Sequence, residues 1–207
     1  MLSEMERLNA PLEADFGDFL SRTVADTGRH MRFLNLLSLL EHMGSRKIML
    51  SQMKGILTQD ILKHLAEETR HAFFFKREAE KLARRPLEGY PQEDTLCAAA
   101  GQFYFGRLDS GLTKPLPKSV HRETGYLWVS LVVELRAIWV YRRYQQTLTQ
   151  AGLPMSLKGI IAEEDRHLED MVQRLDEIGF DVEQALPAAM ALEKNLFSRL
   201  LVSMQAQ

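Results

Sequence analysis

Two motifs of the same kind, Glu68-x-x-His71 and Glu164-x-x-His167, are the residues of this chain best suited to chemistry. Each follows a single glutamate that stands among apolar residues, Glu41 before the first motif and Glu134 before the second. A carboxylate from each of four helices, with a histidine one turn further on two of them, is the ligand pattern of dinuclear iron or manganese centres in helical bundles. The sequence therefore predicts two metal ions in the core of an all-helical protein.

All four glutamates fall on the apolar face of the helix that each would occupy. The neighbours of Glu68 at helical spacing, for example, include Ile61, Leu65 and Phe75. An unpaired charge on such a core-facing stripe costs several kcal/mol, about 3–5 where a buried pair is broken. Glu67 and Glu163 precede the motif glutamates by one residue and are rotated by about 100°. We expect these two side chains to face outward or to support the ligands.

Imidazole and carboxylate ligands suit iron, manganese and zinc, and no cluster of thiolates competes because Cys97 is the one cysteine. We expect two iron ions, with manganese as the alternative. In each motif the Glu and the His share one helix face, so the Glu can bridge two ions while the His binds one. The expected bridges are Glu68 and Glu164, with Glu41 and His71 on one ion and Glu134 and His167 on the other. Six protein ligands leave coordination positions open for dioxygen.

Several other residues have a weaker claim to a functional role. His64 lies one turn before Glu68 and is an extra ligand, a base beside the substrate, or an ordinary, partly exposed histidine. Tyr141 is a hydrogen-bond or radical partner of the site, or a core tyrosine. Asp170 either orients the His167 imidazole, as metal-bound histidines usually require, or is a surface residue. The histidines expected to be structural or exposed are His30, His42 and His121.

The elements that must position these residues are helices, because apolar residues recur at spacings of three and four. The pattern predicts long helices over about 19–51, 58–84, 120–150 and 156–179, and a further C-terminal helix over about 188–204. Ser156 is the expected N-cap of the fourth and Gly179 its C-terminal glycine. Short turns make the first and second pairs antiparallel. The connection 87–118, with a short helix at 95–104, is a long crossover between them, so 1–207 is expected to form a single domain.

The distances of the ligands from the turns place the two glutamates level in the first pair of helices but not in the second. Glu41 and Glu68 lie at similar distances from a turn near residue 54, so antiparallel helices bring them level. Glu134 precedes Gly152 by about eighteen residues, whereas Glu164 follows it by about twelve, a mismatch of roughly 9 Å at the helical rise. An irregular loop at 151–155 must absorb that mismatch.

Composition excludes several other classes of protein. The formal net charge is −2 and the isoelectric point is near 6.3, so there is no basic footprint for nucleic acid. No apolar run is long enough to cross a bilayer and the N-terminal residues have no signal-peptide pattern, so we expect no membrane partner. A single cysteine allows no internal disulfide and fits a reducing cytoplasm.

With this ordered ligand set, the chain resembles the ferritin-like di-iron carboxylate superfamily over about residues 19–179. The resemblance implies a ferritin-like four-helix bundle of two antiparallel hairpins joined by a long crossover, here with an additional C-terminal helix. Bacterioferritins, rubrerythrins, aldehyde-deformylating oxygenases and tRNA hydroxylases share the same ligand order, so the pattern does not distinguish among them.

Departures from these families narrow the implied function. One cysteine cannot build the iron–thiolate domain of rubrerythrins, and Thr69 stands where bacterioferritins carry a haem-binding Met. The mildly acidic chain lacks the basic surface of a tRNA hydroxylase. The resemblance then implies an oxidase or oxygenase that uses dioxygen and an external electron donor on a small, apolar molecule. The alternatives are a ferroxidase or iron-handling protein and a non-catalytic metal-binding scaffold; a homodimer is one possible assembly.

Overall fold

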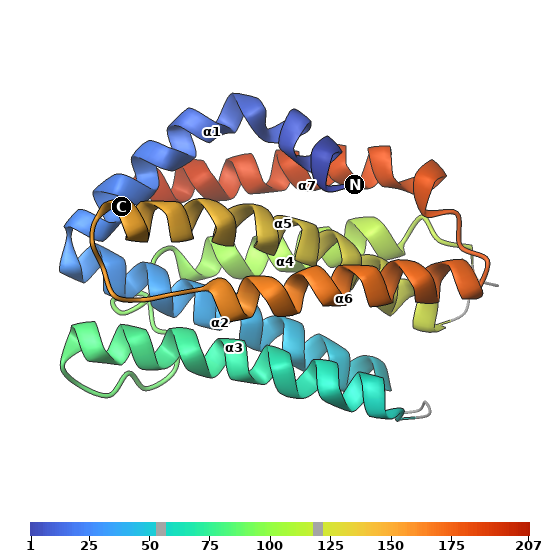
Figure 1. Cartoon of the computed structure of the whole chain (residues 1–207), viewed down its shortest axis with the longest axis horizontal. Helices are drawn as coiled ribbons and strands as arrows, with labels where there is room; N and C mark the ends of the chain where they lie inside the picture. The colour runs from blue at the N-terminus through green and yellow to red at the C-terminus, as the bar shows by residue number, and fades with distance from the viewer. Residues whose placement is uncertain (53–56, 118–121) are drawn as a thin grey trace. The chain divides into compact units, whose positions relative to one another are not determined.

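The computed structural model describes residues 1–52, 57–117 and 122–207, which form helices and no strands. The all-helical prediction is confirmed. In none of the described helices do length and apolar composition suffice to cross a membrane. The helices, labelled in Figure 1, are α1 (Leu2–Ala25), α2 (Thr27–Gln52), α3 (Gln59–Ala83), α4 (Ala98–Thr113), α5 (Arg122–Gln150), α6 (Lys158–Glu177) and α7 (Val182–Gln205).

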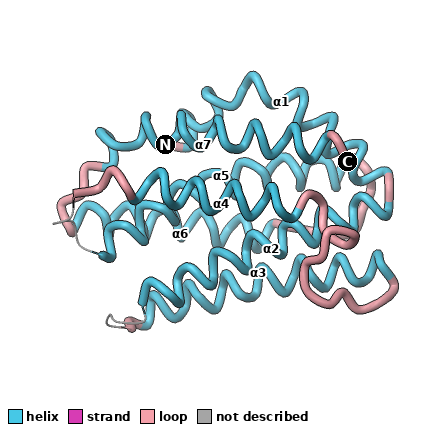
Figure 2. The backbone as a smooth tube through the Cα atoms, turned by 180° about the vertical axis from the view of Figure 1, so that it is seen from behind, coloured by secondary structure: helices cyan, strands magenta, loops and turns pink. Residues whose placement is uncertain are grey.

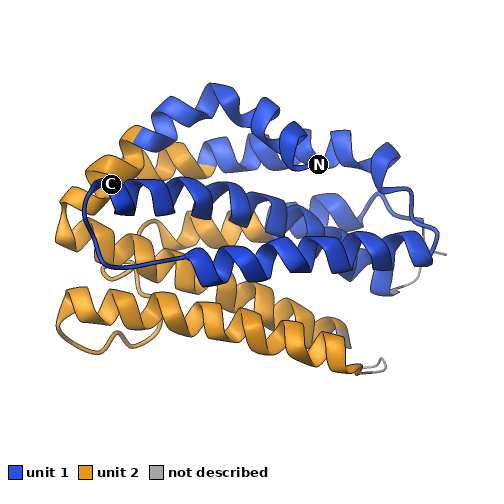
Figure 3. Ribbon diagram, in the orientation of Figure 1, with its two compact units in different colours: residues 1–17, 106–199 blue, residues 18–105, 200–207 orange. Residues whose placement is uncertain are grey.

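The described chain groups into two compact units, each built from separate stretches of sequence (Figure 3). Unit 1 comprises Met1–Gly17 and Gly106–Arg199, and unit 2 comprises Asp18–Phe105 and Leu200–Gln207. The boundaries fall inside α1, α4 and α7. The hairpin of α2 and α3 belongs wholly to unit 2, and the hairpin of α5 and α6 belongs wholly to unit 1.

In unit 2, α2 and α3 lie side by side and antiparallel (Figures 1 and 2). The Ser38 hydroxyl donates to the carbonyl of Ala72 at 2.8 Å, and the Lys76 ammonium donates to Asn35 Oδ1 at 3.0 Å. Thr58 begins α3 as its N-cap, accepting a hydrogen bond from the Ile61 amide. The predicted 58–84 helix is thus confirmed within a residue, while the predicted turn near residue 54 lies outside the described residues.

In unit 1, the segment between α5 and α6 turns back beside α5 before α6 begins. The amide of Leu157 donates to Gln145 Oε1 at 2.6 Å, so residue 157 lies next to a residue more than one turn inside the end of α5. This returning segment is the irregular loop that the register of Glu134 and Glu164 requires. The predicted helices over 120–150 and 156–179 correspond to α5 and α6, with residues 120 and 121 outside the described residues.

Glycines end both helices of this hairpin. Gly152 and Gly179 have φ values of 66° and 72°, in the left-handed region that favours glycine. The amide of Phe180 donates to the Leu175 carbonyl at 2.9 Å and that of Gly179 to the Asp176 carbonyl at 2.9 Å, which is the Schellman pattern. The prediction for Gly179 is confirmed. The prediction for Ser156 is wrong, because the N-cap position is Leu157; the Ser156 hydroxyl accepts the Lys158 amide at 3.5 Å from the preceding position.

The single helix predicted over 19–51 is two helices in the structure. Asp26 separates them and its carboxylate accepts the Arg29 amide at 2.7 Å, as an N-cap of α2 does. Helix α1 also begins at Leu2, far before residue 19. The N-terminal part of α1 is stabilised by distant packing, such as Phe16 against Trp139 with ring centroids 5.0 Å apart, which local spacing does not reveal.

The helix α4 is longer than the predicted 95–104 segment. Its glycines favoured a loop in the sequence, but two of them mark close packing. A Cβ at Gly101 would lie 2.8 Å from a methyl of Leu36, and one at Gly111 would lie 2.6 Å from a methyl of Leu192. Helix α7 likewise begins earlier than residue 188, because the Asp181 carboxylate accepts the Gln184 amide at 2.9 Å and caps it.

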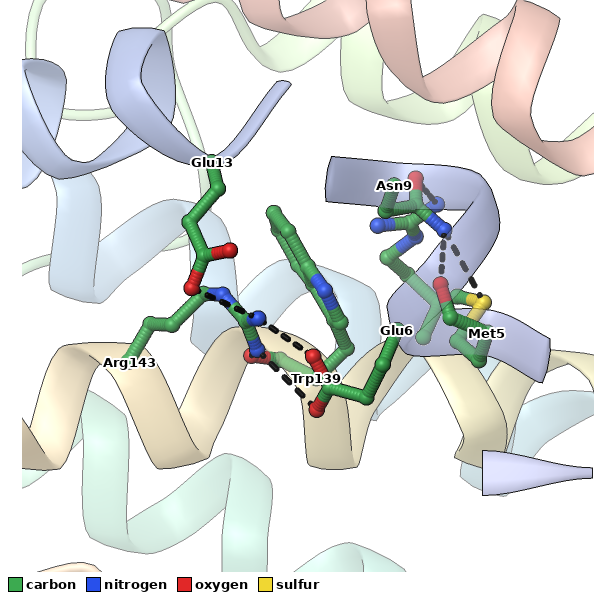
Figure 4. A network of polar contacts seen from close by, with 7 residues as sticks. Met5, Glu6, Asn9, Glu13, Trp139 and Arg143 are labelled. Atoms are coloured by element: carbon green, nitrogen blue, oxygen red, sulfur yellow. Dashed lines mark hydrogen bonds and ion pairs between the residues drawn. The ribbon is translucent and has the colours of Figure 1, made fainter. Parts of the chain in front are cut away.

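Buried polar and aromatic side chains of α1, α5 and α7, here called the joint, pack together inside unit 1. The Arg136 guanidinium donates to Glu193 Oε1 and to Asn9 Oδ1, both at 2.8 Å, and lies 3.9 Å from the centre of the Phe197 ring. Figure 4 shows the neighbouring part of this joint, where Arg143 reaches the carboxylates of α1. The Arg143 guanidinium also lies 4.1 Å from the centre of the Trp139 ring.

Candidate metal centre

The α2–α3 hairpin brings together three of the predicted ligands, Glu41, Glu68 and His71, here called the unit 2 cluster. Each offers a ligand atom within 4.8 Å of the others. His71 Nδ1 lies 3.7 Å from Glu68 Oε1 and 4.0 Å from Glu41 Oε2. All three side chains are buried, so two carboxylates and an imidazole share a small volume from which water is largely excluded.

The register of the hairpin explains this grouping. Ser38 of α2 contacts Ala72 of α3 across the pair. Because the helices are antiparallel, Glu41, three residues after Ser38, lies opposite the stretch between Glu68 and His71. The single glutamate therefore lies level with the Glu-x-x-His motif, as the sequence predicts for helices that meet near residue 54.

His64 extends the unit 2 cluster along α3. Its Nε2 lies 3.5 Å from Glu68 Oε1, on the side of Glu68 away from His71 in the sequence, and its side chain is 11% exposed. Two imidazoles thus face one carboxylate from the preceding and the following turn. This position fits an extra ligand, a base beside the site and an ordinary, partly exposed histidine alike.

Gly44 leaves space for the Glu68 carboxylate, and sequence analysis did not recognise this role. A Cβ at Gly44 would lie 3.4 Å from Glu68 Oε2, at ordinary van der Waals distance, so a larger side chain would meet the carboxylate. The signal was present in the sequence, since Gly44 follows Glu41 by one turn on the same face.

The α5–α6 hairpin holds the other three predicted ligands, Glu134, Glu164 and His167, here called the unit 1 cluster. His167 Nδ1 and Glu164 Oε2 are 2.8 Å apart, a hydrogen-bond distance. Glu134 and His167 offer ligand atoms within 4.8 Å of each other. All three are buried, and Glu164 has no exposed surface.

Two contacts that bracket this cluster show how α5 and α6 are aligned. Gln145 accepts from the amide of Leu157, and Glu123 accepts from Arg174 at 2.8 Å. Glu134 is midway in the sequence between Gln145 and Glu123, and the midpoint of 157 and 174 falls between Glu164 and His167. The single glutamate again lies level with its Glu-x-x-His motif, as in unit 2.

Other predicted residues are placed as follows. Asp170 is exposed, in agreement with a surface residue, and Tyr141 is buried. His30 is buried, which lowers its pKa to about 4, and His42 is partly buried beside the Tyr90 ring. Histidine 121 is outside the described residues. Glu67 is buried, so the outward alternative is wrong for it and support of the ligands stays a prediction, while Glu163 is intermediate in exposure.

The donor chemistry of both clusters fits a hard or borderline divalent cation. Carboxylate oxygens and imidazole nitrogens suit iron, manganese and zinc. Burial raises the pKa of the Cys97 thiol to about 12, so this cysteine is no source of thiolate at neutral pH. Buried carboxylates are stabilised by a cation, because the cation offsets both their mutual repulsion and their lost hydration.

Comparison with protein-family models, with curated proteins and with solved structures found no match to this chain. The proposed function therefore depends on the residues themselves. The two clusters lie in different units.

Proposed function

We propose that this chain is a dinuclear non-haem iron oxidase or oxygenase that uses dioxygen to oxidise a small, apolar substrate. The observation that carries the proposal is the repetition of one arrangement. In each of two separate hairpins a buried glutamate lies level with a buried Glu-x-x-His motif. Two hairpins of this composition supply the four carboxylates and two histidines of a dinuclear centre.

In this proposal the unit 1 and unit 2 clusters together supply the ligands of two metal ions. Glu68 and Glu164 would bridge the two ions, Glu41 and His71 would complete one ion, and Glu134 and His167 would complete the other. Bound iron would supply the open coordination positions and the electrons that reduction of dioxygen needs, with an external donor restoring those electrons. The ligand helices would orient the ions and, through the apolar side chains around them, keep bulk water away.

The test is iron content and oxygen consumption of the full chain after anaerobic loading with ferrous iron. We expect about two iron ions per chain and an oxygen-consumption rate above that of free ferrous iron when a chemical reductant is supplied. Glu68→Gln and Glu164→Gln, one in each hairpin, should each lower both quantities. Glu78→Gln is the matched control, because Glu78 is on the same helix as Glu68 but its carboxylate accepts from Lys81 at 2.7 Å and is no ligand in the proposal.

Any of four results would contradict the proposal. Wild-type protein that holds no iron, or that consumes oxygen no faster than free ferrous iron, would exclude a reactive centre. Consumption that stops after one oxidation of the bound iron, despite excess reductant, together with accumulation of ferric iron would support iron handling instead. Equal metal content in wild type, Glu68→Gln and Glu164→Gln would leave a helical scaffold whose acids hold no metal.

A further inference from the structure

A groove of about 1050 Å³ runs along α6 within unit 1 and is independent of the proposed metal centre. Its other walls are the first residues of α1, the turn after α6 and the start of α7. The floor is apolar and includes Leu168, Val172 and Phe180. Phe180 also contacts Trp128, with ring centroids 5.1 Å apart, so the floor is anchored to the buried side of α5.

The rim of this groove is acidic. Five of the described lining residues are Asp or Glu and none is Lys or Arg; the acids are Asp165, Glu169, Asp176, Asp181 and Glu183. Asp165 accepts a hydrogen bond from Arg142 at 2.8 Å, and Asp181 caps α7, so two of the five already have partners. On a chain with a formal net charge of −2, this is a local concentration of negative charge around an apolar surface.

The lining positions on α6 follow the pattern of a helix-packing seam. They are residues 165, 168, 169, 172, 173 and 176, which repeat at three- and four-residue spacing along about 16 Å of helix. At 100° per residue the centre of this face is turned by about 110° from Glu164 and by more from His167, while Leu168 at its edge is about 40° from Glu164. The volume is at the upper end of the roughly 300–1,000 Å³ typical of small-molecule sites, which favours a peptide occupant.

We propose that the groove binds a basic amphipathic helix of a partner protein. About three turns of such a helix would match the length of the seam. Its apolar residues, at i, i+3 or i+4, and i+7, would pack on Leu168, Val172 and Phe180. Its flanking Lys and Arg side chains would meet the acidic rim, which accelerates association and makes it sensitive to salt.

The test uses the full chain and a fluorescein-labelled helical peptide of about fourteen residues with Leu on one face and Lys on the other. The comparison peptide carries Glu in place of every Lys. We expect the Lys peptide to bind in an anisotropy titration and the Glu peptide not to bind. The double variant Glu169→Lys/Asp176→Lys should weaken binding of the Lys peptide by at least about tenfold. Glu88→Lys/Glu93→Lys, an equal change of charge at two exposed loop acids, should alter it by less than about twofold.

A second measurement locates the peptide without relying on the charge variants. Cys97 is buried, so a thiol-reactive, polarity-sensitive dye can be directed to Gln173→Cys in the groove or, as control, to Gln92→Cys in an exposed loop. The Lys peptide should shift the emission of the dye at 173 and leave that at 92 unchanged. The proposal would be overturned if both double variants weakened peptide binding equally, or if the Lys peptide shifted the emission of both dyes equally. It would also be overturned if spermine shifted the emission of the dye at 173 as much as the Lys peptide does. In each case the surface would respond to charge alone. Absence of binding by the Lys peptide would overturn it as well.

Discussion

At the scale of single residues, the candidate ligands are acids and histidines in places where apolar side chains would be expected. The carboxylates of Glu41 and Glu68 lie close to the same His71 nitrogen inside a hairpin that excludes water. Two like charges at such a distance repel each other strongly when no cation is present. If the proposed centre binds metal, these carboxylates would lower the stability of the metal-free protein and raise its affinity for a cation.

The first prediction concerns how removal of one of these carboxylates changes stability without metal and with metal. Glu68→Gln should raise the free energy of unfolding of the metal-free protein, by about 1 kcal/mol or more, because one of two repelling charges is removed. In the presence of ferrous iron the order should reverse, since the variant loses a ligand and the wild type gains the binding free energy. Thermal unfolding in chelator and in anaerobic iron measures both differences.

Glu78→Gln serves again as the control for this prediction. It should show no reversal between chelator and iron, because Glu78 is no ligand in the proposal. A metal-free Glu68→Gln protein that is less stable than wild type would show that the carboxylate is stabilising in the apo state, contrary to the argument from repulsion.

The second prediction concerns the space beside Glu68. Gly44→Ala should bind iron as the wild type does, because its Cβ would lie 3.4 Å from Glu68 Oε2, an ordinary contact distance. It should also gain up to about 1 kcal/mol of stability from helix propensity. Gly44→Leu should displace the carboxylate and lower iron affinity. Titration with iron under anaerobic conditions, followed by analysis of bound metal, separates the two.

Gly159→Leu is the matched control for Gly44→Leu. Gly159 is also inside a helix, and a Cβ there would meet nothing within 4 Å. Its iron affinity should equal that of the wild type. If Gly44→Leu and Gly159→Leu behave alike, the space at Gly44 has no role in positioning Glu68.

At the scale of elements, unit 1 depends on a joint that holds the first part of α1 and the long α7 against α5. Arg136 on α5 and Glu193 on α7 form a doubly hydrogen-bonded ion pair that is almost wholly buried, with Asn9 of α1 on the same guanidinium. A buried ion pair contributes little net stability over apolar residues of similar volume, but removal of one partner strands the other charge.

The third prediction follows from this asymmetry. Glu193→Ala should lower the free energy of unfolding by about 3–5 kcal/mol, because it leaves the Arg136 guanidinium buried without its carboxylate. The double variant Arg136→Met/Glu193→Leu should recover most of that loss. Urea denaturation of the metal-free chain measures both, with Glu183→Gln, at an exposed position of α7, as the control expected to be near wild type. A double variant no more stable than Glu193→Ala would show that packing, and not the stranded charge, causes the loss.

At the scale of the whole molecule, stability should depend on pH through a histidine outside the proposed centre. Burial lowers the pKa of His30 to about 4, below the ordinary value of about 6.5. The unfolded chain therefore binds a proton at this residue between pH 6.5 and 4 while the folded chain does not. Stability is complete above pH 6.5 and falls as the pH is lowered through that interval, by at most about 1.4 kcal/mol per pH unit from this group.

The fourth prediction tests this pH dependence with His30→Gln, whose side chain does not titrate. In the metal-free protein the free energy of unfolding of the variant should fall less steeply between pH 6.5 and 5 than that of the wild type. Measurement at pH 7.5, where His30 is neutral in both states, gives the loss caused by altered packing alone. Parallel curves for the two proteins below pH 6.5 would assign the acid sensitivity to other groups.

Much of this molecule could be predicted from its sequence because the informative signals are local. The ligand motifs, the apolar faces and the turn glycines all act within one or two helical turns, and α3, α5 and α6 were predicted accordingly. The starts of α2 and α7 depend on the local caps Asp26 and Asp181, which apolar spacing does not register. The other failures have non-local causes. Phe16 stabilises α1 through Trp139, far away in sequence. The glycines of α4 indicate a loop by their type, although Gly101 and Gly111 permit close packing of a helix. Burial of Glu67 beside Glu68 is a further effect of tertiary packing that helical periodicity alone did not indicate.

The composition of unit 2 has a consequence for how the chain is made. The carbonyl of Met204 accepts from Arg29 and the side chain of Gln207 accepts from the Cys97 amide, so the early residues of this unit are closed by the latest ones. At a synthesis rate of about 5–20 residues per second, the ribosome needs roughly 5–20 s to proceed from the first half of α4 to those closing residues. During that interval the α2–α3 hairpin, which carries Glu41, Glu68 and His71, has been synthesised but lacks the contacts made by residues 204 and 207. A nascent-chain experiment that arrests translation before residue 200 would therefore capture the hairpin without its closing contacts.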